Sequence, residues 1–304
     1  MVGSDKTDVS IGAVNILHEG PEEYKNIWQK VRSMWSYIYD HYYDKYDWFH
    51  IGGDDLYLIP ENLRLYLESE EIQTAANGGV YLPDGTETTQ VPLFLGRRFA
   101  YQGDMEDIFN SGGSGYTMNK AALKTLVVEA LPNIMPHRHT FSEDTMVAKL
   151  LKNFNVYPYE TKDETGGERY MPFMPGHHYR YRMPPNKKDD WYAKYSINIK
   201  EGLDHCAAKS VAFHYVKDND MKRLYAYLYH LCPDDEKRQI SAAAAEQEHR
   251  LKPFASQWHY LIWVSVLLLC FIIFISFAKL PKKQQRRRKE LLDDSSLQEP
   301  LLII

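Results

Sequence analysis

Two adjacent carboxylates near residue 50 have the type and spacing to do chemistry. The apolar run Trp48–Ile51 is a strand candidate that is ended by Gly52 and Gly53, and Asp54 and Asp55 follow directly. Carboxylates in this place can supply oxygen ligands to a metal ion, because ligands of α/β folds bind at the C-terminal edge of the sheet. The same residues are also typical of a solvated turn. The motif alone leaves both interpretations open.

A second acidic pair and a histidine lie further along the chain. Glu143 and Asp144 follow Ser142 at the start of a predicted helix, where Ser142 is a candidate N-cap and the helix dipole stabilises acidic groups. A carboxylate in this place can also serve as a general base. His214 lies among aromatic and apolar residues, where a structural role is more common than metal binding.

Elements that would position these groups can be read from hydrophobic periodicity and from turn residues. Apolar residues at helical spacing predict an amphipathic helix over residues 22–43. The sequence further predicts a helix over 60–72, a strand over 91–95, a glycine turn at residues 111–115 and a helix that begins near Asn119. Strands alternating with helices indicate an α/β fold with a largely parallel sheet flanked by helices.

The composition is that of a globular protein, with 304 residues, of which 44% are hydrophobic and 13% aromatic. The formal net charge of −5 conceals a basic cluster after the most apolar segment, formed by Lys282, Lys283, Arg286, Arg287, Arg288 and Lys289. Its position indicates a membrane boundary, and nucleic-acid binding is not expected.

A single-pass membrane topology follows from the uncharged residues 260–278, which are about as many as a helix needs to cross a bilayer. We expect a domain at 1–235, a charged stalk at 236–257, a transmembrane helix at 258–279 and a cytosolic tail at 280–304, which places the domain in the Golgi or ER lumen. The first residues show no signal peptide. Either the chain is N-terminally incomplete, or it is tail-anchored with a cytosolic domain.

Six segments in a fixed order carry a family resemblance: YDWFHIGGDDLYLIPENLRLYL, PLFLGRRF, SGGSGYTMNKAAL, SEDTMVAKLL, MPFMPGHHY and SVAFHYV. Together they resemble the core 1 β-1,3-galactosyltransferases, the glycoprotein-N-acetylgalactosamine 3-β-galactosyltransferases of glycosyltransferase family 31, over residues 22–233. The resemblance implies a GT-A fold, a UDP-galactose donor, a divalent metal ion and a GalNAc acceptor linked to Ser or Thr.

The same resemblance assigns the metal site. The family has an Asp triplet after the strand, and here Gly53 takes its first position. Asp55 is then the expected direct ligand and His214 the second, while Asp54 assists donor binding through the ribose or a metal-bound water. An imidazole with carboxylates suits Mn²⁺ better than Mg²⁺, which stays an alternative. The two ligands should lie within ~5 Å of each other to share one ion.

Inverting transfer requires a base opposite the leaving group, and Asp144 matches the family position for it, with Glu143 as its neighbour. Gly112 and Gly113 match a glycine-rich turn that lets the backbone approach the donor, and a purely structural turn fits them equally well.

Two further pairs are interpreted as structural. We expect His177 and His178 to pack in a loop near the site. We expect Trp191 and Tyr192 to belong to an aromatic core rather than to a wall that stacks on the acceptor.

The chain also departs from the family. It starts without the first strands, which hold the uridine. It also retains few of the family's cysteines, and a Cys206–Cys232 disulfide is an open option. The expected partners are a UDP-sugar, a glycoprotein acceptor and the lipid around one helix, with a homodimer as an open option. Two alternatives remain, a fringe-like β-1,3-N-acetylglucosaminyltransferase and a catalytically dead membrane partner or chaperone of an active glycosyltransferase.

Overall fold

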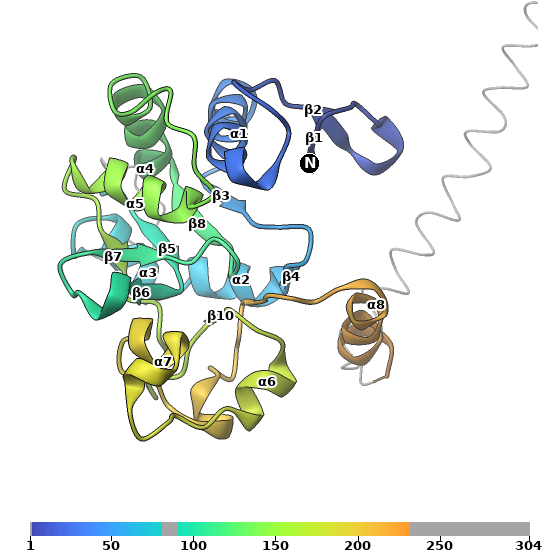
Figure 1. Ribbon diagram of the computed structural model, residues 1–304, viewed down its shortest axis with the longest axis vertical. Coiled ribbons are helices and arrows are strands. Elements are labelled where there is room, and N and C mark those ends of the chain that lie inside the picture. The colour runs from blue at the N-terminus through green and yellow to red at the C-terminus, as the bar shows by residue number, and fades with distance from the viewer. Residues whose placement is uncertain (1, 81–89, 232–304) are drawn as a thin grey trace, which may run out of the picture. The chain divides into compact units, whose positions relative to one another are not determined.

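The computed structural model describes residues 2–80 and 90–231 (Figure 1). The chain divides into two units, Met1–Arg223 and Leu224–Ile304, and every residue proposed above for the site lies in the first. The expected stalk, transmembrane helix and tail lie outside the described residues. Among the residues that are described, no helix has the length and apolar character needed to cross a membrane.

The strands of the described part are short. They are β1 (Val2–Ser4), β2 (Ala13–Asn15), β3 (Trp48–Ile51), β4 (Tyr57–Leu58), β5 (Phe94–Gly96), β6 (Arg98–Ala100), β7 (Ile108–Asn110), β8 (Tyr116–Asn119), β9 (Pro158–Tyr159), β10 (Tyr170–Met171) and β11 (Ala212–Phe213). The strand predicted at 48–51 is confirmed as β3. The strand predicted at 91–95 begins later, as β5.

The central sheet has the order β3-β8-β5-β9 and is mixed, so the prediction of a largely parallel sheet is wrong. β8 lies antiparallel between β3 and β5, with Ile51 opposite Tyr116, and the β5–β9 pair is parallel. Parallel neighbours need a long crossover, usually a helix. Here the β6–β7 hairpin and a glycine turn connect β5 to β8, and the chain reverses instead.

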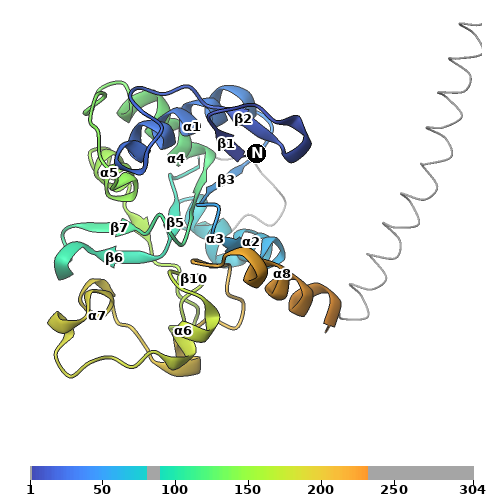
Figure 2. The same ribbon diagram turned by 45° about the vertical axis from the view of Figure 1, so that its right-hand side comes forward.

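A second, smaller sheet has the order β10-β11-β4, and its strand β10 lies between the central strands and the α6–α7 region in both views (Figures 1 and 2). β11 is parallel to β10 and antiparallel to β4. Phe213 of β11 is opposite Tyr57 of β4, so the residues just before β4 meet those just after β11. This register brings Asp55 to the segment that carries His214.

The described residues also form helices and short helical turns. They are α1 (Ile27–Tyr42), α2 (Pro60–Leu67), α3 (Glu70–Ala76), α4 (Lys120–Lys124), α5 (Glu143–Lys152), α6 (Pro175–Arg180), α7 (Trp191–Tyr195) and α8 (Asp218–Ala226), with short 3₁₀ or π turns η1 (Val9–Ile11), η2 (Tyr24–Asn26), η3 (Tyr101–Gly103), η4 (Thr125–Ala130), η5 (Lys187–Asp189), η6 (Gly202–His205) and η7 (Tyr227–Leu231). The single helix predicted at 60–72 is two helices, because Ser69 has an extended backbone and its hydroxyl caps the N–H of Ile72.

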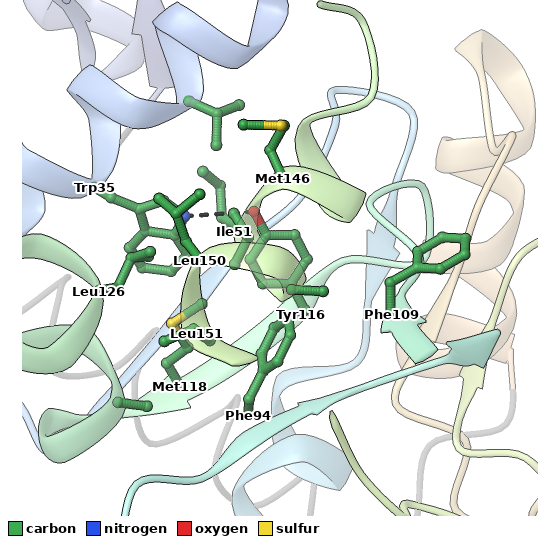
Figure 3. Packing of buried hydrophobic residues seen from close by; sticks show 14 of the residues in the cluster. Trp35, Ile51, Phe94, Phe109, Tyr116, Met118, Leu126, Met146, Leu150 and Leu151 are labelled. Atoms are coloured by element: carbon green, nitrogen blue, oxygen red, sulfur yellow. Dashed lines mark hydrogen bonds between the residues drawn. The ribbon is translucent and has the colours of Figure 1, made fainter. Parts of the chain in front are cut away.

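The main core lies between α1, α4, α5 and the central sheet, where large side chains interdigitate (Figure 3). The predicted amphipathic helix is confirmed as α1, whose buried face carries Trp28, Val31, Trp35 and Ile38 at helical spacing. Trp35 is fully buried and its indole N–H donates to the hydroxyl of Tyr116, 3.4 Å away. This core supports β8 and α5, which flank the glycine turn.

Candidate active site

Asp55 lies in the turn between β3 and β4, where the chain leaves the central sheet for the smaller one. Its Oδ1 is 3.2 Å from Nε2 of His214, and each side chain is less than one-fifth exposed, 18% for Asp55 and 16% for His214. The expected proximity of the two side chains is therefore confirmed. Their role as metal ligands stays a prediction.

The imidazole of His214 is held from its other side by a hydrogen bond to the backbone carbonyl of Pro172. Burial lowers the pKa of His214, and the charge of Asp55 opposes that shift in part. One ring nitrogen thus faces a backbone carbonyl and the other faces a carboxylate, and a carbonyl that orients the ring from one side is usual for metal-binding histidines. Gly113 allows this packing, because a Cβ there would lie 2.4 Å from the ring.

One carboxylate and one imidazole fit a divalent ion whose coordination is completed by water and by a substrate's phosphates, as is usual for ions that bind nucleotides. Among the described residues, no group of three or more His, Cys, Asp and Glu side chains gathers around a common point. A Cβ at Gly53 would lie 3.0 Å from Oδ1 of Asp55, so a carboxylate there would have adjoined this pair. Asp55 and His214 are therefore the two side chains here that could ligate such an ion, among the residues that the structure describes.

Lys217 is a charged neighbour that sequence reasoning missed. Its Nζ lies 3.5 Å from Oδ2 of Asp55, and its side chain is 63% exposed. The only signal in the sequence is its position three residues after His214. We call Asp55, His214 and Lys217 the Asp55 cluster.

The turn that carries Lys217 has an unusual backbone. Tyr215 and Asp218 have φ of 57° and 46°, and the N–H of Val216 donates to the carbonyl of Asp55 over 2.9 Å. Non-glycine residues in this region cost on the order of 1–3 kcal/mol each. An exposed ion pair returns about 0–1 kcal/mol, so the Lys217–Asp55 contact does not account for the strained turn by its stability alone.

The second acidic pair, Glu143 and Asp144, begins α5 and is called here the carboxylate pair. Oδ2 of Asp144 accepts the N–H of Gly112 over 3.0 Å, and Oδ1 accepts the N–H of Thr145 over 2.8 Å. Ser142 is at the N-cap, but its side chain forms no capping hydrogen bond. Burial raises the pKa of Asp144 although these hydrogen bonds oppose the shift.

Glu143 is the more strongly shifted of the pair. Burial, and after it the charge of Asp144, raises the pKa of Glu143 to about 8, while a hydrogen bond from the hydroxyl of Tyr116 over 2.7 Å lowers it in part. The same hydroxyl accepts from Trp35, as the dashed line in Figure 3 shows. Glu143 is therefore fixed to the core and carries a proton at neutral pH, whereas Asp144 faces the glycine turn.

That glycine turn, residues 111–115, contacts both acidic sites. Gly112 donates to Asp144, and a Cβ on it would lie 2.0 Å from Oε1 of Glu143. Gly113 packs directly on His214. Gly115 has φ of 67° and closes the turn by donating to the carbonyl of Gly112 over 2.9 Å. The predicted residues Asp55, His214, Gly113, Gly112 and Asp144 thus form one continuous chain of contacts, and their functional roles stay predictions.

An exposed aromatic pair, also missed from the sequence, lies beside the carboxylate pair. Tyr24 and Phe141 stack with ring centroids 6.2 Å apart, and they are 70% and 59% exposed. Partial burial, and after it the charges of Asp144, Tyr215 and Glu143, raise the pKa of Tyr24, so the pair lies within electrostatic range of both acidic sites. Apolar rings left in water next to charged groups suit a ligand with both apolar and hydroxylated faces.

The remaining predicted residues lie apart from this arrangement or at its edge. Asp54 is exposed in the same turn as Asp55. His178 is fully buried and its Nε2 accepts the N–H of Phe173, as expected for a structural residue, whereas His177 is exposed and stacks on Phe173.

The aromatic-core interpretation holds for Tyr192, which is 1% exposed, and is wrong for Trp191, which is 54% exposed. Trp191 is the first residue of the short helix α7, and its ring packs against Phe99 and Phe173 while it stays half exposed. Cys206 is partly buried, and Cys232 lies outside the described residues, so their pairing stays a prediction.

Comparison with known proteins found relatives, two of which are described here. The chain is 28% identical over 229 residues to glycoprotein-N-acetylgalactosamine 3-beta-galactosyltransferase 1 of Xenopus laevis, which covers 75% of this chain and 57% of the relative. It is 26% identical over 141 residues to human chondroitin sulfate synthase 3, which covers 42% of this chain and 14% of that protein. No family model matches the chain. The chain is thus similar to a core 1 galactosyltransferase and spans little more than half of its length.

Proposed function

We propose that this protein is a glycosyltransferase that moves galactose from UDP-galactose to the 3-hydroxyl of an O-linked GalNAc on a glycoprotein, with inversion and with Mn²⁺ or Mg²⁺ as cofactor. The similarity to a galactosyltransferase and to a chondroitin sulfate synthase supports a sugar transferase. The name of the first relative specifies galactose transfer to N-acetylgalactosamine of a glycoprotein, and we extend this donor sugar and this acceptor to the chain by similarity.

The observation that carries the proposal is the glycine turn shared by the Asp55–His214 pair and the carboxylate pair. A single-displacement transfer needs a leaving-group site and a base on opposite faces of the same anomeric carbon. Contact with both groups through two consecutive glycines, which have no side chains to intervene, supports their acting on one sugar.

In this scheme each residue has a defined task. Asp55 and His214 would hold the metal ion, which when bound neutralises charge on the departing UDP. Asp144 takes the proton of the acceptor's 3-hydroxyl as that oxygen bonds to the anomeric carbon and the bond to UDP breaks. Glu143, protonated and tied to Tyr116, keeps Asp144 in place. Asp54 contributes to donor binding from the exposed side of the turn.

The stacked rings of Tyr24 and Phe141 belong to the acceptor side of the proposed site. A sugar ring presents a C–H face that packs on aromatic rings, while its hydroxyls reach the nearby carboxylates. We also propose that a transmembrane helix at 258–279 anchors the domain in the lumen of the Golgi or ER, with the basic tail in the cytosol.

The test uses the full chain purified in detergent. UDP-galactose and UDP-N-acetylglucosamine are each supplied with a GalNAc-O-peptide, with Mn²⁺ or with EDTA. We expect Mn²⁺-dependent transfer of galactose, which Asp55→Ala and His214→Ala abolish. Transfer of N-acetylglucosamine alone would assign the fringe-like activity, and full activity in EDTA would remove the metal ion from the scheme.

A second candidate function is favoured by the glycine at position 53 and by Lys217, since both weaken a divalent-ion site. In that case the chain is a catalytically dead membrane protein that assists an active glycosyltransferase. Absence of transfer with either donor, together with co-purification of an active enzyme, would support it over the first proposal.

A further inference from the structure

Each carboxylate oxygen of Asp55 faces a nitrogen. His214 occupies the Oδ1 side at 3.2 Å, and the ammonium of Lys217 occupies the Oδ2 side at 3.5 Å. An ammonium has no acceptor and cannot bind a metal ion, so Lys217 competes with a cation for the carboxylate. Its position therefore needs an explanation other than metal binding.

The backbone holds Lys217 in this place. The hydrogen bond from Val216 to the carbonyl of Asp55 ties the two segments together, and the left-handed residues Tyr215 and Asp218 flank it on either side. Such residues persist at sites where the surrounding structure over-determines them. The strained turn thus fixes the point from which the lysine side chain extends, while its 63% exposed stem is free to turn toward a ligand.

Charge balance indicates which ligand that is. Gly53 leaves the turn with one acidic group fewer than an Asp triplet, and Lys217 adds one positive charge. Both changes reduce the attraction for a divalent cation and increase the attraction for an anion. A nucleoside diphosphate is the anion that would lie beside Asp55 and His214.

We propose that Lys217 binds the diphosphate of the nucleotide donor directly. In the free protein it pairs with Asp55, and when the nucleotide enters it moves to the phosphate oxygens, which releases Asp55 to the metal ion. This assignment rests on the proposed use of a UDP-sugar. It makes Lys217 a binding residue that supplies part of the positive charge on the donor.

Two binding measurements on the full chain test this assignment without an activity assay. The variants are Lys217→Met, Lys217→Arg and the control Lys209→Met, which alters another exposed lysine of the same segment. Mn²⁺ binding to the nucleotide-free protein is measured by electron paramagnetic resonance of the free ion. UDP binding is measured by calorimetry in Mn²⁺ and in EDTA.

We expect Lys217→Met to bind UDP about 10-fold more weakly in both buffers, because one charge-assisted contact is lost. It should bind Mn²⁺ about 3- to 10-fold more tightly, because the competing ammonium is gone. Lys217→Arg should keep most of the UDP affinity, and Lys209→Met should match the wild type in both measurements.

Opposite signs in the two measurements distinguish a diphosphate-binding lysine from a structural one. If Lys217→Met weakens both UDP and Mn²⁺ binding, the lysine only supports the fold of the turn. If wild type and Lys217→Met bind UDP equally, the assignment is wrong while the proposed function stands. A wild-type chain that binds no UDP in either buffer would overturn both.

Gly53→Asp provides an independent check. The added carboxylate would adjoin Asp55, and position 53 does not have a positive φ. We expect about 10-fold tighter Mn²⁺ binding and UDP binding that depends more strongly on Mn²⁺ than in the wild type. Unchanged Mn²⁺ affinity in this variant would contradict the charge balance on which the assignment rests.

Discussion

Asp144 borders the glycine turn directly and Asp55 reaches it through His214, and the surroundings of the two carboxylates differ. Asp55 lies in the connection between two sheets, where its oxygens face an imidazole and an ammonium. Asp144 begins α5 on the main core, where its oxygens accept backbone N–H groups and its neighbour Glu143 is tied to Tyr116.

The difference shows two ways of keeping a carboxylate in a site. In the Asp55 cluster, charged and polar side chains balance the charge, and the partners can be exchanged for a ligand. In the carboxylate pair, burial raises the pKa of both groups, and one proton held by Glu143 relieves their repulsion. The first arrangement suits binding of ions, and the second suits proton transfer.

The largest effect should come from removing the proton acceptor. We expect Asp144→Asn to lower kcat by about 10²- to 10⁴-fold, the range for loss of a general base, while UDP binding stays at the wild-type level. Glu143→Gln should lower kcat much less, because Glu143 is already protonated at neutral pH. Steady-state kinetics with UDP calorimetry measures both. Loss of UDP binding in Asp144→Asn with unchanged turnover would show that Asp144 is not the base.

The pH dependence of stability should expose the buried proton on Glu143. Its pKa is raised from 4.5 to about 8, so between these values the folded chain retains a proton that the unfolded chain has released. The free energy of unfolding therefore falls as pH rises through this window, by an amount on the order of a few kcal/mol. Denaturant titrations of the wild type and Glu143→Gln from pH 5 to 9 measure it. The variant should show a flatter profile, and parallel profiles would mean that Glu143 is ionised in the folded protein.

Local elements of the fold could be predicted from the sequence, but their pairing could not. The spacing of Trp28, Val31 and Trp35 was sufficient to predict the helix α1, because apolar residues three or four positions apart fall on one face of a helix, whereas a strand needs alternation. The direction of β8 depends on how β5 returns through a hairpin, which alternation of strands and helices does not encode. The break at Ser69 was missed because the apolar pattern continues across it.

For the site, motifs located the acidic groups but not their partners. The resemblance placed Asp55, His214 and Asp144, and in the structure His214 and Asp144 contact the glycine turn while Asp55 contacts His214. Lys217, Tyr24 and Tyr116 were missed, because a lone lysine or tyrosine has no distinctive spacing and acquires a role only through contacts between distant segments. The raised pKa of Glu143 likewise results from burial against the core.

The smallest expected effect sharpens the comparison at the acceptor side of the carboxylate pair. Tyr24→Ala removes one ring of the exposed Tyr24–Phe141 stack, and because a stacking contact is worth about 0.5–1.5 kcal/mol, the acceptor KM should rise by roughly 3- to 10-fold. UDP binding should change less than the acceptor KM, since the carboxylate that acts most strongly on Tyr24 is that of Asp144. Tyr46→Ala is the matched control, an exposed tyrosine beyond the end of α1.

Tyr24→Phe should keep the acceptor KM if the ring face is what matters, whereas an equal rise of the acceptor KM in Tyr24→Phe and Tyr24→Ala would assign the contribution to the hydroxyl of Tyr24. An unchanged acceptor KM in Tyr24→Ala would place the acceptor elsewhere and leave the exposed stack unexplained.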